Sequence, residues 1–213
     1  SCMSKAAGAD VFAVDMGMID KVDGLIDHRI AAGTRNIAKE PAMTYDDALN
    51  AVMTGINLVK ERKTEGYNLI ATGEAGIGDT TTSSAVLAVL MDQNAAAVTG
   101  RGSGLSDEGL LRKQNAITNA IKINCPDKND VIDVLSKVGG FDIAAMCGVF
   151  IGGALYNVPV IMDGFISGVA ALCAVRLCEN VKGYIVPSHI TAEPAGIMIM
   201  NELGFEPIIH GDM

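Results

Sequence analysis

The sequence predicts an α/β protein: a parallel sheet with helices on both faces, in three layers, formed as one domain over residues 1–213. Short apolar runs, glycine-rich turns and helix-like segments alternate in at least four successive units, an order typical of parallel strands joined by helical crossovers. Apolar residues make up 49% of the chain and charged residues 19%, a balance that a sheet buried between helices explains. At 213 residues the chain is long enough to bury one large core.

The first expected strand covers residues 9–16 and places Asp15 at its carboxyl end. Open α/β sheets bind ligands at the carboxyl ends of their strands, so Asp15 stands where a ligand contact is expected. Residues 20–39 have no clean hydrophobic period, and this predicts a long irregular loop.

Residues 44–62 give the clearest helix prediction. Thr44 can cap the first turn, with Asp47 three residues on as its partner in a capping box. Gly66 is expected to end the helix. Apolar side chains recur at three- and four-residue spacing, which predicts one buried face made of Leu49, Val52, Met53, Ile56 and Val59.

The stretch 68–92 is the part of the chain around which we expect the binding loops to gather. An apolar run at 69–71 enters a turn that contains Gly73, Gly76 and Gly78, and a hydroxyl-rich segment then begins a small apolar helix. Glycines let the backbone approach a ligand closely, and the unpaired N–H groups of a first helical turn bind anions, phosphate above all. The order of strand, glycine loop and helix start therefore indicates an anion site.

The remaining elements follow the same alternation. Further strands are expected at 95–99, 158–162 and 184–186. Helices are expected to begin at Ser106 and to cover 129–138, 141–156, 167–177 and 191–204, with Thr191 as the cap of the last one. The loops of these units would meet at one edge of the sheet, and this convergence is the main argument for a binding site.

Glu74 is a carboxylate inside the first glycine loop. The loop matches neither the P-loop nor the dinucleotide fingerprint, so spacing alone leaves a phosphate or nucleotide site and a tight structural turn as equal alternatives. Because like charges at close range cost energy, we expect Glu74 to face a sugar hydroxyl or a nitrogen base of the ligand.

Three other polar residues or pairs lie near expected loops. Lys113 stands two turns into its helix and can bring an ammonium group to an anion, although a solvated lysine is the ordinary alternative. Asp163 is expected at a strand end, where Asp-Gly also makes turns. Ser188 and His189 suggest a nucleophile pair, but neighbouring strand residues face opposite sides and no G-x-S-x-G elbow surrounds them, so a serine hydrolase is not expected.

Composition excludes several classes of protein. The net charge is −9, aromatic residues are 4% and no Lys/Arg cluster is present, which argues against a nucleic-acid partner. The longest apolar tract, 143–162, is broken by glycines and a proline, so no membrane span is expected, and no signal peptide opens the chain. The histidines have no metal-ligand spacing, so we expect no metal. Five cysteines without C-x-x-C spacing predict reduced, mostly buried thiols in a cytoplasmic protein.

Five segments resemble, in the same order, the family of nicotinate-nucleotide–dimethylbenzimidazole phosphoribosyltransferases. They are GEAGIGDTTTSSAV, TGRGSGLSDEGLLRK, DVLSKVGGFDIAAMCGVFIGGA, VPVIMDGFISGVAAL and SHITAEPAG. The likeness extends from Ala9 to the end of the chain, and five motifs in order make chance similarity very unlikely.

The resemblance implies a transferase that acts in building the lower ligand of cobalamin. It would transfer the ribosyl 5′-phosphate of nicotinate mononucleotide to 5,6-dimethylbenzimidazole, giving α-ribazole 5′-phosphate and nicotinate. The family fold is a Rossmann-like α/β domain with a small helical domain built from both chain ends. The resemblance further implies a homodimer with small-molecule substrates, without a cofactor or a metal.

Most of the family's functional positions fall on residues already singled out. The resemblance places Glu74, Gly76, Ile77 and Gly78 in the loop that lines the nucleotide and base pocket. It also assigns Gly102, Ser103 and Lys113 to phosphate holding, and Asp163 and Ser188 to the ribose and phosphate end.

Two departures from the family pattern bear on activity. Asp79 stands where the family usually has asparagine, which adds a negative charge near the expected anion site. The family's catalytic glutamate motif would lie beyond Met213, and family residues before Ser1 supply much of the helical domain. We therefore expect a core fragment that binds the nucleotide but turns over poorly or not at all, with Glu74 as a weaker catalytic base. The alternatives are a non-catalytic nucleotide- or phosphate-binding module, and the same transfer to another acceptor base.

Overall fold

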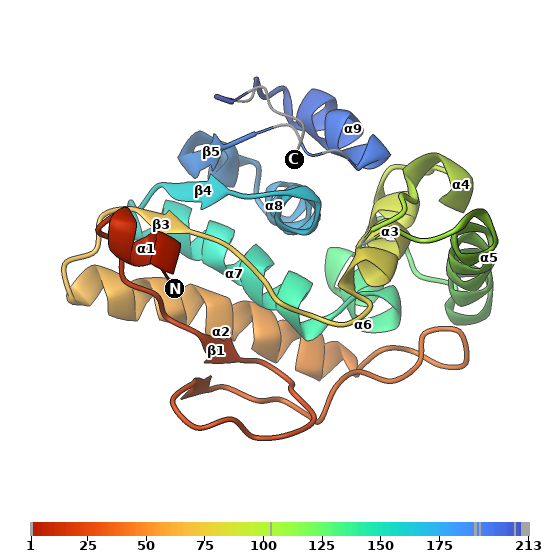
Figure 1. The fold of residues 1–213 in the computed structure, drawn as a ribbon, viewed down its shortest axis with the longest axis horizontal. Coiled ribbons are helices and arrows are strands. Elements are labelled where there is room, and N and C mark those ends of the chain that lie inside the picture. The colour runs from red at the N-terminus through yellow and green to blue at the C-terminus, as the bar shows by residue number, and fades with distance from the viewer. Residues whose placement is uncertain (1, 103, 190, 192, 207, 210–213) are drawn as a thin grey trace.

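The fold is described from a computed structural model, which describes residues 2–102, 104–189, 191, 193–206, 208 and 209 (Figure 1). The chain is mostly helical, with two small parallel sheets. The helices are α1 (Cys2–Ala6), α2 (Tyr45–Thr64), α3 (Asp79–Leu90), α4 (Ala95–Val98), α5 (Asp107–Asn124), α6 (Val131–Val138), α7 (Phe141–Tyr156), α8 (Phe165–Leu177), the 3-10 helix η1 (Glu179–Tyr184) and α9 (Pro194–Leu203). The strands are β1 (Val14–Asp15), β2 (Ile26–Asp27), β3 (Ile70–Ala71), β4 (Val160–Met162) and β5 (Ile185–Pro187).

The main sheet has the parallel order β3-β4-β5, with Ile70 opposite Val160 and Val160 opposite Ile185. Helices α7 and α8 both contact β4 and pack against each other. The α/β class and the parallel pairing are confirmed, but the expectation of a large three-layer sheet is met only in part. Each strand has two or three residues, and most of the buried core belongs to helices.

The first expected strand forms a different sheet. Residues 14–15 pair in parallel with 26–27, a strand inside the segment expected to be a loop throughout. The buried carboxylate of Asp15 accepts hydrogen bonds from the backbone N–H groups of Gly17 at 2.9 Å and Met18 at 2.8 Å. Asp15 therefore stabilises the turn that follows it. It belongs to a separate sheet and does not lie at a strand end of the main sheet, where a ligand contact was expected.

The strand predicted at 95–99 is wrong, because residues 95–98 form the short helix α4. The Asn94 side chain caps this helix by accepting a hydrogen bond from the backbone N–H of Ala97 at 2.9 Å. Three consecutive alanines follow the cap, and alanine has the highest helix propensity of all residues. The capping signal was present in the sequence and outweighs the apolar run that suggested a strand.

Helix α2 confirms the predicted capping box, since the Thr44 side chain accepts from the Asp47 N–H and the Asp47 side chain accepts from the Thr44 N–H. The predicted buried face is wrong in part. Leu49 is 42% exposed and Met53 is 46% exposed, whereas Gly55 on the other side is buried. Helix α2 turns its small residues inward instead.

Two glycines explain the choice of face, because α2 and α7 touch through their backbones (Figure 1). A Cβ added to Gly148 would lie 1.9 Å from the backbone oxygen of Val52, and one added to Gly55 would lie 1.9 Å from that of Ala145. Only residues without a side chain allow the axes to come this close, so the pair of glycines sets the rotation of α2.

Helix α9 begins later than predicted. Its first residue is Pro194, and the cap position is Glu193 rather than Thr191, whose hydroxyl accepts from the Glu193 N–H at 3.3 Å. Proline is favoured at the first helical position because its fixed φ suits a helix and its missing N–H would be unpaired there. The helix ends at Leu203, followed by Gly204 with φ of +63°, as the sequence predicts.

Two further expectations concern bilayers and thiols. In the described part of the chain, none of the helices combines the length and hydropathy that crossing a membrane demands. Cys147 and Cys173 are buried, and burial raises the pKa of the Cys173 thiol to about 12. Cys125 and Cys178 are exposed, so burial holds for only part of the expected set.

Candidate functional site

The carboxyl ends of β3, β4 and β5 lie at one edge of the main sheet, and hydroxyl groups tie two of them together. The Thr72 hydroxyl, just after β3, donates to the backbone oxygen of Ile161 at 3.0 Å and contacts the Ser167 hydroxyl. The Asp163 N–H, just after β4, donates to the same Ser167 hydroxyl at 3.2 Å. The start of α8 thus holds the ends of β3 and β4 in a fixed relation.

Ser188 follows β5 and lies beside the end of β4. Its hydroxyl donates to the backbone oxygen of Met162 at 2.7 Å and lies 3.4 Å from that of Asp163. The structure therefore brings the predicted residues Asp163 and Ser188 together. Ser188 and His189 are also in contact, with Oγ and Nδ1 2.9 Å apart. The expectation that Ser188 and His189 face opposite sides is wrong, because both residues follow the end of β5 at Pro187 and are free of the alternation of a strand.

The predicted glycine loop leads from β3 into α3 and is exposed along residues 73–78. Gly78 occupies the cap position of α3 with φ of +84°, a conformation that glycine adopts without strain. Ile77 is fully exposed, so its side chain packs against nothing in this structure. The loop therefore offers backbone groups and an apolar side chain to a ligand.

Three carboxylates gather beneath this loop: Glu74, Asp79 and Asp142. One oxygen from each of the three lies within 4.8 Å of the other two. Gly76 passes close to two of them, since a Cβ there would lie 2.7 Å from Asp79 Oδ2 and 3.2 Å from Asp142 Oδ2. Glycine at 76 thus makes room for the acidic cluster.

The cluster changes how Glu74 titrates. Glu74 as a residue is exposed, but its carboxyl end lies against the other two groups. Desolvation at the carboxyl, a hydrogen bond with Asp79 and the charges of Asp79 and Asp142 raise the pKa of Glu74 to about 8. Burial also raises the pKa of Asp142. At neutral pH Glu74 therefore carries a proton, so its own carboxyl group adds no negative charge that would repel a bound anion.

The spacing of these oxygens would admit a cation, but acidic groups gather in this way in many proteins without one. A cation site needs further ligands, and we assign no metal to this cluster.

Asp79→Asn is expected to lower the pKa of Glu74, because the amide carries no charge and can donate a hydrogen bond to the ionised carboxylate. Folded wild-type protein holds the Glu74 proton up to a pH of about 8, whereas the unfolded chain releases it near 4.5. The stability that this proton contributes is full below 4.5 and is lost as pH rises through about 8.

The Asp79→Asn variant is expected to lose less stability than the wild type across that pH range, as measured by urea unfolding at several pH values. Asp23→Asn, which removes the same charge from an exposed position, is the control. Identical pH profiles for Asp79→Asn and the wild type would contradict the assigned cause.

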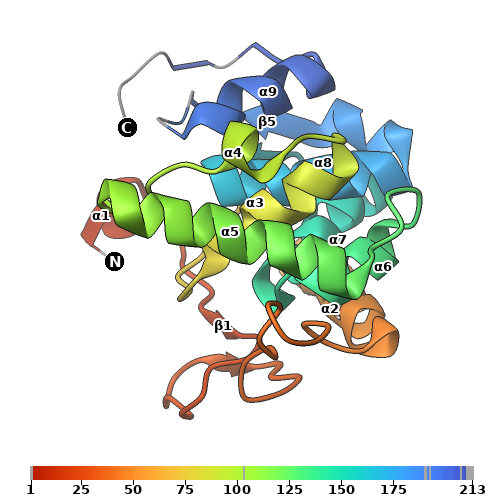
Figure 2. The same ribbon diagram turned by 90° about the vertical axis from the view of Figure 1, so that its right-hand side faces the viewer.

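Lys113 reaches from α5 to the amino end of α3, and Figure 2 shows these helices side by side. Its Nζ donates to the Thr80 hydroxyl at 2.9 Å and to the backbone oxygen of Gly100 at 3.3 Å. Lys113 is only 8% exposed, and burial lowers its pKa while the charges of Glu193 and Asp79 act against that effect. The structure thus rejects the alternative of a solvated lysine.

Gly102 lies next to this ammonium group. A Cβ added there would lie 3.3 Å from Thr80 Oγ1 and 3.7 Å from Lys113 Nζ. Its backbone N–H donates to Glu193 Oε1 at 2.8 Å. The Gly102 backbone therefore packs closely enough against Thr80 and Lys113 to crowd a side chain at this position, while its amide is engaged by Glu193. The predicted neighbour Ser103 lies outside the described residues.

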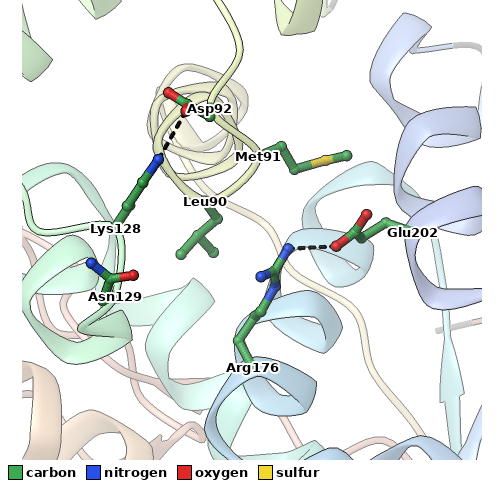
Figure 3. A pocket seen from close by; sticks show the side chains of 7 residues that line it. All are labelled: Leu90, Met91, Asp92, Lys128, Asn129, Arg176 and Glu202. Atoms are coloured by element: carbon green, nitrogen blue, oxygen red, sulfur yellow. Dashed lines mark hydrogen bonds and ion pairs between the residues drawn. The ribbon is translucent and has the colours of Figure 1, made fainter.

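Two hollows lie elsewhere and contain none of the predicted site residues. One of about 220 Å³ opens between the end of α3 and helices α8 and α9 (Figure 3). Its cations are paired, Lys128 with Asp92 at 2.8 Å and Arg176 with Glu202. The other, of about 520 Å³, lies beside His28 and the polar face of α2. The candidate site is thus an open edge of the sheet rather than either hollow.

Sequence reasoning missed two carboxylates of this edge, Asp142 and Glu193. Both lie in segments already noted for their resemblance to a family, whereas the Thr80 hydroxyl belongs to the cluster expected to begin the helix at the anion site. The contacts of the two carboxylates join segments far apart in the chain, such as Gly102 and Glu193, so no local spacing could have found them.

Comparison with known proteins gives consistent results along the whole chain. A family model described as "Phosphoribosyltransferase" matches residues 1–213. The chain is 51% identical to a nicotinate-nucleotide–dimethylbenzimidazole phosphoribosyltransferase of Acetivibrio thermocellus, covering all of this chain and 61% of that protein. It is 47% identical to the protein of the same name from Clostridium tetani, covering 99% of this chain and 59% of that one.

A solved structure matches the fold of this chain over its whole length. The crystal structure of CobT from Thermus thermophilus matches with a TM-score of 0.94 at 31% identity, covering 100% of this chain and 64% of that chain. The present chain thus spans about 60% of the length of the curated relatives it matches. Within that length, the chain belongs to the nicotinate-nucleotide–dimethylbenzimidazole phosphoribosyltransferase family.

Proposed function

We propose that this chain forms the nucleotide-binding core of an enzyme that transfers ribosyl 5′-phosphate from nicotinate mononucleotide to 5,6-dimethylbenzimidazole. The products are α-ribazole 5′-phosphate and nicotinate, and the reaction serves the synthesis of the cobalamin lower ligand. The observation that carries the proposal is the buried Lys113 ammonium at the amino end of α3, next to the Gly102 backbone. As part of the same proposal, the enzyme is a cytoplasmic homodimer.

The phosphate would bind between Lys113 and the start of α3. A helix start carries partial positive charge, and a poorly hydrated ammonium group attracts a phosphate strongly. The Thr80 hydroxyl adds a donor that can turn from one partner to the other. Asp163 and Ser188, at the ends of β4 and β5, would then face the ribose.

In the transfer, the bond between ribose C1′ and the pyridine nitrogen breaks, and a bond from C1′ to a benzimidazole nitrogen forms. Nicotinate leaves with the electron pair of the broken bond, and the sugar passes through an oxocarbenium-like state. The acceptor must give up its N–H proton, and Glu74 is the carboxylate proposed to take it. A pKa of about 8 makes Glu74 a stronger base than an ordinary carboxylate once it is ionised.

Glu74→Gln is expected to lower the transfer rate by about a hundredfold, because an amide cannot accept the proton. In the wild type, the rate is expected to rise with pH and to level off above about 8, where Glu74 is ionised. The measurement is chromatographic detection of α-ribazole 5′-phosphate formed by this chain from both substrates, over a pH range that spans the Glu74 pKa.

Glu179→Gln, an exposed change of the same kind in η1, serves as the control. Transfer that is equally fast at both ends of the pH range would exclude Glu74 as the proton acceptor. Binding of nicotinate mononucleotide without any transfer would support a binding module instead. A competition among several acceptor bases, with dimethylbenzimidazole not preferred, would favour the alternative acceptor.

A further inference from the structure

Glu193 connects two parts of the candidate site that are far apart in sequence. It is the residue before α9, five positions after Ser188. Its Oε1 accepts a hydrogen bond at 2.8 Å from the backbone N–H of Gly102, 91 residues away in the chain. The entry to α9 is therefore fastened directly to the glycine loop beside Lys113.

The surroundings of the Glu193 carboxylate are unusual for a residue that only begins a helix. Its second oxygen, Oε2, is buried and has no hydrogen-bond partner among the residues that the structure describes. A carboxylate loses hydration energy when it is buried in this way. Attraction to a nearby cation offsets that cost, and the negative charge of Glu193 attracts the ammonium group of the buried Lys113.

The hydrogen bond also changes what Gly102 can contribute. An amide that donates to Glu193 is not directed at a ligand, although the family resemblance assigns Gly102 to phosphate holding. Gly102 has φ of +55° and lies close to Thr80 and Lys113. Its contribution is then the close approach of its backbone to these two residues, and that approach lasts only while the loop keeps this position.

We infer that Glu193 is a positioning residue of the proposed phosphate subsite: its carboxylate holds the Gly102 backbone against Lys113 and Thr80, so that this side of the subsite keeps one conformation when a 5′-phosphate binds. This inference rests on the proposed function. Glu193 acts through Gly102 and does not itself contact the substrate. A single hydrogen bond to a charged acceptor is strong enough to fix a short glycine loop, whose backbone would otherwise sample many conformations.

The test compares Glu193→Ala, which removes the acceptor, with Glu193→Gln, which keeps a carbonyl oxygen at the same place. Glu206→Gln is the control, since Glu206 is an exposed carboxylate a few residues beyond α9. Nicotinate mononucleotide and inorganic phosphate are titrated calorimetrically into each variant of this chain. Hydrogen–deuterium exchange of the Gly102 amide is measured without ligand.

Glu193→Ala is expected to weaken both ligands by about tenfold and to speed exchange at Gly102. Glu193→Gln is expected to bind within about threefold of the wild type and to keep the amide protected, because the neutral oxygen still accepts. A purely structural role for the residue would lower stability without this recovery by glutamine.

Unchanged exchange at Gly102 in Glu193→Ala would overturn the inference. Tighter binding in both variants would also overturn it, because the carboxylate would then compete with the phosphate. If the wild type binds neither ligand while exchange increases only in Glu193→Ala, the proposed function fails and the anchoring of the loop by Glu193 stands.

Discussion

Gly148→Ala is expected to lower the free energy of unfolding by roughly 2–3 kcal/mol, the upper part of the range for overpacked cores. The added methyl group would lie 1.9 Å from the backbone oxygen of Val52 and 2.8 Å from its carbonyl carbon. A side chain could rotate away, but a backbone can yield only if the whole of α2 moves. Alanine favours a helix over glycine by about 1 kcal/mol, and this gain is too small to offset the clash.

The measurement is urea unfolding followed by far-ultraviolet circular dichroism. Gly183→Ala is the matched control, because a Cβ at that position would meet nothing within 4 Å. The control is expected to stay within about 0.5 kcal/mol of the wild type. If Gly148→Ala were as stable as the control, α2 and α7 would not be in backbone contact.

Lys113→Met is expected to weaken the binding of nicotinate mononucleotide by about a hundredfold, because the phosphate loses its charged partner at a poorly hydrated site. Methionine keeps most of the length of the side chain but carries no charge. Burial already lowers the pKa of Lys113, so removal of the ammonium group also removes a desolvation cost. Methionine also removes the hydrogen bonds to Thr80 and Gly100 and the cation that offsets the burial of Glu193, so the variant is expected to unfold at a lower urea concentration than the wild type but to stay folded without denaturant.

Calorimetric titration and urea unfolding of the same preparation separate these two effects. Lys122→Met, an exposed change in the same helix, is expected to alter neither. Binding that survives in Lys113→Met would remove the observation on which the proposed function depends. Loss of the folded circular-dichroism signal without denaturant would indicate that Lys113 supports the fold rather than the ligand.

Much of the fold was predictable where the signal is local. The capping box at Thr44, the end of a helix at residue 138 and the long helix 141–156 all follow from residues within one or two turns of each other. The parallel orientation of β3, β4 and β5 was predictable as well, because helices separate these strands along the chain.

The remainder depends on contacts between distant segments. The buried face of α2 was predicted from apolar spacing, but Gly55 and Gly148 set the rotation of the helix and leave Leu49 and Met53 partly exposed. Hydrophobic periodicity gives glycine no weight, so it favoured the wrong side chains.

The candidate site was likewise predictable only in part. The glycine loop at 73–78 and Lys113 could be found by residue type and position. The partners that set their chemistry could not, because Asp142 and Glu193 come from other elements and act only after the chain has folded.

The contact between α2 and α7 has a mechanical consequence. Two helices whose main chains interlock can neither slide nor roll past each other without separating, so they form a single stiff strut. Any adjustment that accompanies the arrival of a substrate is left to the glycine-rich connections at the sheet edge, and the strut supplies the fixed frame against which those connections move.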